Sequence, residues 1–177
     1  AYEGEKKNLA LIDDAASSDK PEPLDTPHRM SAEISEWLTS IVSEVLTFEA
    51  DDYKSDMQSE ALYFDDTGRR AYLGFLETNK MIKVLDSQQY HIRSFVEDTP
   101  TPLNEGAVSG VYRWLYEVPV MVSYMDRDMK DYTKSDATTQ QVILTLQVGR
   151  SSTASDLGVV IEQWDAKIGE IKTPNKK

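Results

Sequence analysis

The chain has 177 residues, a formal net charge of −12 at pH 7 and an isoelectric point near 4.6. This charge argues against nucleic acid as a partner and against docking on an anionic membrane surface, because both need clustered Lys and Arg side chains. The absence of cysteine excludes disulfides, cysteine-based zinc sites and a cysteine nucleophile. No apolar run approaches the length of about 18 residues that would predict a membrane span.

Residues 1–29 are rich in proline, serine and aspartate, and their main apolar run is confined to residues 9–12. A segment of this composition cannot bury enough surface to offset the entropy that it loses on ordering. We therefore expect a flexible N-terminal tether. It serves either as a spacer between the domain and an anchor or as an ordinary frayed terminus.

One long amphipathic helix is predicted directly after this tether. Its apolar residues recur at helical spacing and would form a continuous stripe along one face. Ser31 is the expected N-cap, and Glu33 suits the positive end of the helix dipole. The stripe consists of Ile34, Trp37, Leu38, Ile41, Val42, Val45 and Leu46.

Two or three shorter helices are predicted between residues 51 and 87. Asp51 or Asp52 would cap the first of them and Asp66 or Thr67 the second, because a side-chain oxygen at the N-cap accepts a hydrogen bond from the first turn. The first half of the chain is therefore predicted to be helical.

The second half changes to a period of two, which predicts strands. Turn residues between positions 99 and 106 predict a loop there. Pro119 lacks a backbone donor, so we expect an edge position or a bulge at that point of the long strand. The four predicted strands cover residues 90–96, 111–125, 141–148 and 157–164.

Helices followed by a meander of strands predict an α+β fold with an antiparallel sheet. We expect one domain over residues 30–166 and a disordered, lysine-rich tail over residues 167–177. The sequence contains no glycine-rich nucleotide fingerprint, so nothing in it predicts a cofactor.

The strand-forming run from Gly110 to Tyr124 resembles a strand of the DotI/IcmL and TraM family, G-x-Y-x-W-x-x-x-x-P-x-x-V-x-Y. Residues 141–150 and 158–164 are similar to the last two strands of that family. Residues 63–68, ahead of a predicted helix, resemble it as well. The similarity extends over roughly residues 31–165, in the order that the family has, and its specificity lies in the whole set of matches.

The resemblance implies a nuclear-transport-factor-2-like cone, in which a curved four-stranded antiparallel sheet wraps around a long first helix and smaller helices. It also implies the periplasmic domain of an inner-membrane component of type IVB secretion and related conjugation systems, with one transmembrane helix upstream of residue 1. Family members form oligomers, so the expected partners are further copies and other secretion-complex subunits. The resemblance carries over no catalytic residue, and we predict a non-catalytic assembly component.

The alternative is a small-molecule-binding or enzymatic member of the same superfamily, because fold alone does not transfer function. His91 could point into the cone beside Asp98 or Glu117 and act as a general base, although a lone strand histidine is more often structural. His28 lies in the tether. An open polar interior would favour the alternative, and an interior filled by apolar side chains would favour the scaffold.

Two acidic groups could supply oxygen ligands to a hard cation, namely the run of Asp51, Asp52 and Asp56 and the pair Asp65 and Asp66. The spacing of a calcium-binding loop is absent. Aspartates at helix N-termini are explained by capping and by the helix dipole, so no metal site is predicted.

The candidate subunit-contact residues come from two regions. Glu36 and Glu44 belong to an acidic face, which either keeps the domain soluble or meets a basic partner. Tyr112, Trp114 and Tyr116 alternate along the long strand, where they either fill the core or form a contact patch. The solvent exposure of Trp114 distinguishes these two interpretations.

Overall fold

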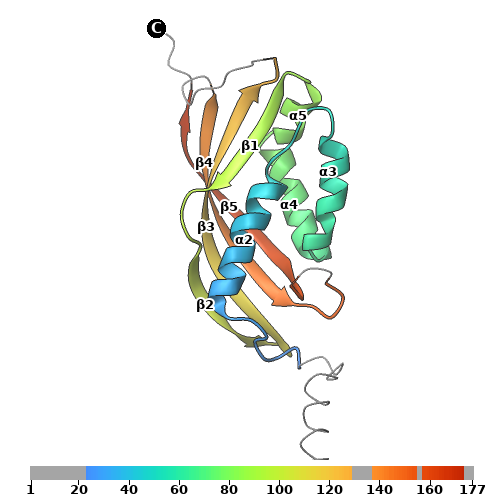
Figure 1. Ribbon diagram of the computed structural model, residues 1–177, viewed down its shortest axis with the longest axis vertical. Coiled ribbons are helices and arrows are strands. Elements are labelled where there is room, and N and C mark those ends of the chain that lie inside the picture. The colour runs from blue at the N-terminus through green and yellow to red at the C-terminus, as the bar shows by residue number, and fades with distance from the viewer. Residues whose placement is uncertain (1–22, 129–136, 155–156, 174–177) are drawn as a thin grey trace, which may run out of the picture.

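The computed structural model describes residues 23–128, 137–154 and 157–173 (Figure 1). Its helices all precede its strands along the chain, which confirms the α+β class. The helices are α2 (Ser31–Val45), α3 (Tyr53–Glu60), the 3₁₀ turn η1 (Ala61–Tyr63), α4 (Asp66–Thr78) and α5 (Met81–Asp86). The strands are β1 (Tyr90–Val96), β2 (Thr101–Val108), β3 (Val111–Asp126), β4 (Thr138–Arg150) and β5 (Val159–Lys172).

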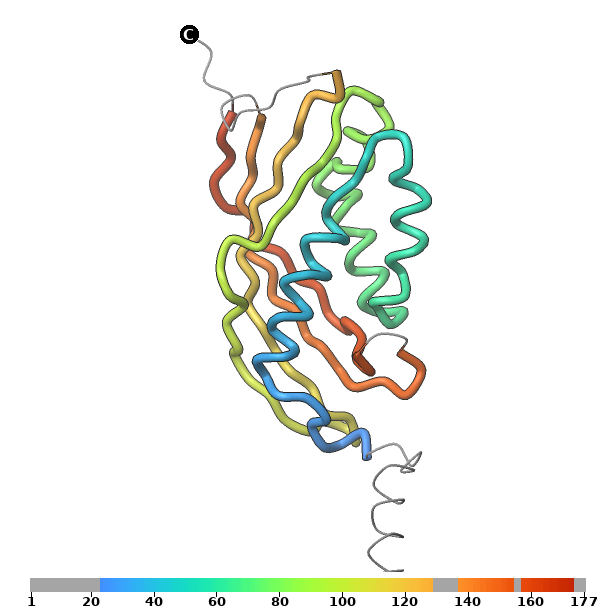
Figure 2. The backbone as a smooth tube through the Cα atoms, in the orientation of Figure 1, coloured from blue at the N-terminus to red at the C-terminus, as the bar shows by residue number. Residues whose placement is uncertain are grey.

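The sheet is antiparallel throughout, with the order β1-β3-β4-β5 and β2 also paired to β3. β3 connects the other strands of the sheet, because its N-terminal part pairs with β2 and its C-terminal part with β1. Figure 2 shows the strands curving along their length, with the helices on one side. The curved sheet and the long first helix are the predicted architecture, but the sheet has five strands instead of four.

The fifth strand is β2, in the region for which a loop was predicted. Ser109 and Gly110 both have positive φ angles, of 52° and 80°, and form a two-residue hairpin that brings Val108 opposite Val111. Pairing therefore begins at this turn and continues past the turn-favouring residues. It tolerates them through a register shift between Pro102 and Asn104.

Pro119 lies neither on an edge strand nor at a bulge, because β3 pairs with β4 along this stretch without a shift. It lies at the point where the strand on the other side of β3 changes from β2 to β1. Pairing with β2 ends at Glu117, and pairing with β1 begins at Val120. The missing donor of the proline therefore falls in the gap between two partner strands.

The helices cover one face of the sheet and fill the space above it. The apolar stripe of α2 is buried, with Ile34, Leu38 and Val42 fully inaccessible. They pack in one core with the alternate residues of β3 and β4. A second set of contacts surrounds Trp164 of β5, whose ring centroid lies 5.2 Å from that of Tyr72.

The N-termini of α2 and α4 differ from the predicted caps by one residue. Met30 precedes α2, and the Ser31 hydroxyl contacts the Tyr116 hydroxyl instead of capping the helix. Asp65, not Asp66 or Thr67, caps α4 by accepting a hydrogen bond from Gly68 N at 2.7 Å. Asp52 precedes α3 without a side-chain cap.

Two predicted boundaries are wrong. β5 continues to Lys172, so residues 167–172 belong to the sheet and not to a disordered tail; they were missed because their apolar residues do not alternate regularly. Residues 23–29, which were predicted to belong to the tether, lie against the domain through the hydrogen bonds described below, so the packed part of the chain begins before residue 30. Residues 1–22 and 174–177 lie outside the described part of the chain.

Gly68 and Gly74 of α4 provide a matched test of the packing of this helix on β5. A Cβ atom at residue 68 would overlap the carbonyl oxygen of Ile161, whereas at residue 74 it would meet nothing. Gly68→Ala should lower the free energy of unfolding by about 1–3 kcal/mol through this clash. Gly74→Ala should raise it by about 0.5–1 kcal/mol through helix propensity alone.

Urea unfolding of the two variants measures both effects. Equal effects from the two substitutions would contradict the close approach of α4 to β5.

Candidate subunit-contact surfaces

The interior of the cone is filled by side chains of the helices and the sheet. Trp114 is 1% exposed and Tyr116 is fully buried, which is the core interpretation of these two aromatic residues. The Tyr116 hydroxyl donates to the Ser31 carbonyl oxygen at 2.6 Å and ties β3 to the start of α2. Neither side chain is available to a partner in this conformation.

His91 does not point into the cone, and its neighbours are not Asp98 or Glu117. Its Nδ1 atom lies 3.0 Å from the backbone nitrogen of Ala50 and 3.0 Å from Glu49 Oε2. These contacts fasten the connection between α2 and α3 to the first residues of β1. The expected position was wrong because Phe48 forms a bridge with Ile92 and brings the loop to this strand. His91 therefore has a local structural role.

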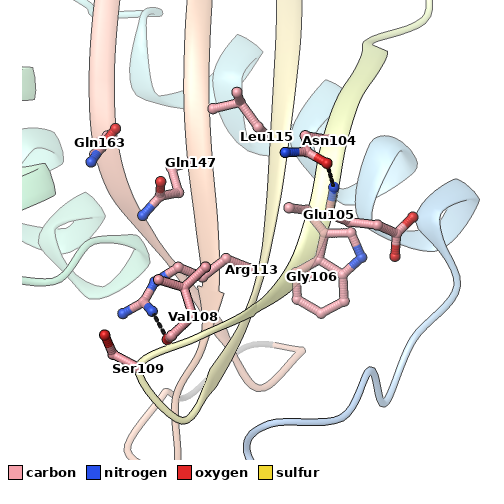
Figure 3. A pocket seen from close by; sticks show the side chains of 10 residues that line it. Asn104, Glu105, Gly106, Val108, Ser109, Arg113, Leu115, Gln147 and Gln163 are labelled. Carbon is pink, nitrogen blue, oxygen red and sulfur yellow. Dashed lines mark hydrogen bonds between the residues drawn. The ribbon is translucent and has the colours of Figure 1, made fainter.

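An open groove of about 420 Å³ lies beside the hairpin of β2 and β3 and is lined by side chains of β2 to β5 (Figure 3). Both of its charged residues are engaged, since Arg113 Nε lies 2.7 Å from Glu162 Oε1 and Glu105 Oε2 accepts a hydrogen bond from the Tyr112 hydroxyl. Gln147 donates to the Glu162 carboxylate at 3.1 Å. Its lining contains no histidine and no pair of carboxylates arranged for proton transfer.

A second groove, of about 490 Å³, runs along α2 opposite the connection from β1 to β2. Glu36 lines it, together with small side chains of the same helix. Glu36 and Glu44 are both exposed, and within the described residues neither has an ion-pair partner. Tyr112 is partly exposed and donates to Glu105 Oε2 at 2.7 Å. These three residues are the predicted contact residues that a partner can reach.

Part of the remaining acidic face is neutralised within the domain. Asp51 Oδ1 lies 2.6 Å from Arg127 Nη2, and Glu49 Oε1 lies 2.5 Å from Arg93 Nη2. No group of three or more acidic or histidine side chains arranged for a metal ion occurs in the part of the chain that the structure describes. The acidic side chains near Asp56 instead repel one another, and burial together with that repulsion raises the pKa of Asp56.

Glu60 at the end of α3 is a buried carboxyl group, only 5% exposed. The Tyr72 hydroxyl lies 2.6 Å from the Val45 carbonyl oxygen and 3.2 Å from Glu60 Oε2. The hydroxyl donates to the nearer carbonyl oxygen and, over the longer distance, to the Glu60 carboxyl oxygen, so this second hydrogen bond favours the ionised form of Glu60. Burial raises the pKa of Glu60 to about 8, with Glu44 adding to the rise and the Tyr72 hydrogen bond opposing it.

Residues 23–29, here called the strap, cross the end of the sheet where β3 begins and β4 ends. Arg150 is 9% exposed, and its Nη1 atom donates to the carbonyl oxygens of Pro23 at 2.6 Å and Thr26 at 2.9 Å. The backbone nitrogen of Tyr112 donates to the Leu24 carbonyl oxygen at 2.6 Å. One buried guanidinium and one strand amide therefore fix where the chain enters the domain.

His28 closes the strap at its other end. Its Nε2 atom lies 2.7 Å from the Leu157 carbonyl oxygen, in the loop before β5. Its ring centroid lies 6.1 Å from that of Trp114, so the strap helps to bury that tryptophan. The sequence did not reveal these roles of Arg150 and His28, because their partners are more than 120 residues away along the chain.

No helix in the described residues is long and apolar enough to cross a membrane. A curved antiparallel sheet covered on one face by a long first helix and shorter ones defines a nuclear-transport-factor-2-like fold. Solved domains of type IV secretion subunits share it. The periplasmic domain of DotI superposes with a TM-score of 0.68 at 21% identity, covering 80% of this chain and 98% of that one.

Two further solved structures have the same fold. A periplasmic fragment of TraM has a TM-score of 0.66 at 14% identity, covering 79% of this chain and 100% of the fragment. An IcmL-like type IV secretion system protein from Legionella pneumophila has a TM-score of 0.65 at 16% identity, covering 85% of this chain and 99% of that one. No curated protein matches the sequence.

The model of the DotI/IcmL family, described as an inner-membrane complex component of the type IVb secretion system, matches residues 16–168. The chain belongs to this family.

The Glu60 carboxyl should make stability depend on pH. In the folded state it keeps its proton up to about pH 8, whereas the unfolded chain releases it near the ordinary value of 4.5. The stability that it contributes is therefore fully present below pH 4.5 and lost as the pH rises to 8. Glu60→Gln mimics the protonated form and should raise the free energy of unfolding at pH 8 by roughly 2–4 kcal/mol.

Urea titrations between pH 5 and pH 9 measure this difference. Glu36→Gln, at an exposed position of α2, is the control and should keep the wild-type slope. A Glu60→Gln variant with an unchanged slope would show that this carboxyl does not hold the proton.

Arg150→Met should release the strap, because the carbonyl oxygens of Pro23 and Thr26 lose their shared donor. The amide of Tyr112 donates to the strap at Leu24, so its hydrogen exchange should accelerate by about tenfold or more. Nuclear magnetic resonance resolves this single amide. Arg70→Met, at an exposed position of α4, should leave the exchange rate of Tyr112 unchanged.

Proposed function

We propose that this chain is the periplasmic, non-catalytic domain of an inner-membrane subunit of a type IVB-like or conjugative secretion system. It acts by associating with further copies and by contacting other subunits. The membership of the DotI/IcmL family supports the location and the system. In this proposal a transmembrane helix upstream of the domain anchors it to the inner membrane.

The observation that carries the non-catalytic role is the filled interior. Enzymes of the same fold class need a cavity in which titratable groups converge on a substrate. Here Trp114, Tyr116 and Val118 are at most 1% exposed and pack against the helices. The histidines serve the loop before α3 and the strap, as their distances to Ala50 and Leu157 indicate. What the domain offers a partner is therefore its surface.

The surface of α2 is the proposed contact with another subunit. Glu36 and Glu44 lie two turns apart on the exposed side of this helix, and the first lines the groove along it. Clustered negative charge orients a basic partner and speeds its association. The strap supports the same role, because its hydrogen bonds to Arg150 hold the segment that leads into α2 in a fixed position on the sheet.

The double substitution Glu36→Lys/Glu44→Lys should reduce the recovery of other secretion subunits about tenfold or more when the membrane-embedded protein is purified in mild detergent. The control Glu77→Lys/Glu117→Lys makes the same change of net charge at two exposed positions elsewhere and should not reduce it.

Equal recovery with both variants would refute the α2 contact. A protein that stays monomeric and carries no other subunit out of the membrane would refute the proposed function as a whole.

A further inference from the structure

β5 is the outer strand of the sheet, and within the described residues only β4 pairs along it. Its first part is protected, because Asp65 N donates to the Ile161 carbonyl oxygen at 3.2 Å and α4 packs against it. Residues 165–172 are all exposed. Figure 1 shows this red part of β5 at the margin of the sheet, beside β4 and away from the helices. An open strand edge of this length is a template for pairing with another strand.

The open part of β5 also carries apolar side chains. Ile168 is 37% exposed and Ile171 is 57% exposed. Their partners in β4 are Val142 and Gln140, so both isoleucines lie on the face of the sheet that carries the core, beyond the area that the helices cover. A monomer gains nothing from exposed isoleucines on a bare edge, whereas a second strand would cover them.

The charged residues along this edge can form opposite-charge pairs with those of a second copy of the same segment. Residues 165–172 are Asp-Ala-Lys-Ile-Gly-Glu-Ile-Lys. When two copies of the segment run antiparallel around an axis between Ile168 and Gly169, Asp165 of one copy comes opposite Lys172 of the other. Lys167 comes opposite Glu170 in the same way. Each of these pairs occurs twice, and opposite charges directly across a strand pair stabilise it.

A bulge in β5 places Asp165 and Lys172 on the same face of the sheet, as this register requires. Residues seven apart lie on opposite faces of a regular strand, but the pairing of β5 shifts by one residue between Gln140 and Val142. Asp165 is therefore opposite Thr145 and Lys172 opposite Thr139, and these threonines are six residues apart on one face. A two-fold axis through a continuous sheet requires the two charges to share a face in this way.

We propose that residues 165–172 form a homotypic contact, in which β5 strands of two copies pair antiparallel and join their sheets into one. This inference rests on the proposed self-association and names the surface that makes it. Exposed ion pairs contribute little individually, so the contact is weak in solution. It becomes effective where a membrane anchor raises the local concentration of subunits.

Exchanging the charges at residues 165 and 172 tests the register of the two β5 strands. Asp165→Lys places two lysines opposite each other at both ends of the contact and should weaken the dimer of the 177-residue chain about tenfold or more, as measured by sedimentation equilibrium. The double variant Asp165→Lys/Lys172→Asp restores opposite charges and should recover the wild-type dissociation constant. Circular dichroism checks that each variant is folded.

Disulfide formation tests the geometry independently, since the chain has no cysteine of its own. Ala166 and Ile171 of opposite copies face each other in this register. Their Cα atoms would lie about 4.5–5.5 Å apart, within the reach of a disulfide. Ala166→Cys/Ile171→Cys should therefore give a covalent dimer on mild oxidation. Arg70→Cys/Glu77→Cys, on the exposed side of α4, should give none above background.

The outcomes separate this inference from the proposed function. A chain that associates equally well with Asp165→Lys and forms no 166–171 cross-link associates through another surface, which overturns the inference alone. Loss of association in both charge variants would mean that Asp165 and Lys172 of opposite copies do not meet in this register, which also overturns it. A chain that does not associate at all, in solution or in the membrane, overturns both.

Discussion

The apolar side of β3 is the constraint on which the rest of the domain depends. Its alternate side chains from Trp114 to Val122 are at most 1% exposed and form the surface on which α2 packs. The same strand pairs with β1, β2 and β4, so it defines both the sheet and the core. Burying one continuous apolar row on each of two elements stabilises the fold through the hydrophobic effect. Polar substitution along this row would affect every neighbour at once.

The fold was largely predictable from periodicity, because α2 and β3 each repeat their own pattern over many residues. β2 was missed, since its proline, asparagine and glycine favour turns and its pairing depends on the hairpin at Ser109 and Gly110. The last part of β5 was missed for a related reason. Its bulge puts Ile168 and Ile171 on one face at an odd spacing, which hides the alternation that identifies a strand.

The surfaces were harder to predict than the fold. The sequence could indicate that Trp114 and Tyr116 are either core or interface, and only their burial in the folded domain decides between the two. Arg150 and Glu60 gave no signal, because their roles depend on partners far away in the sequence, the strap for one and Tyr72 for the other. Sequence patterns report which face a residue occupies, whereas a buried polar group is explained only by what it meets.

The strap has a mechanical consequence. Any tension applied to the chain ahead of Pro23 reaches the domain through the hydrogen bonds to Arg150 and Tyr112, before it can act on the first turn of α2. Both of these residues belong to long strands at the centre of the sheet. A pull on this segment would therefore be distributed over the strand pairs of β3 and β4, and the helix that carries Glu36 and Glu44 would keep its position.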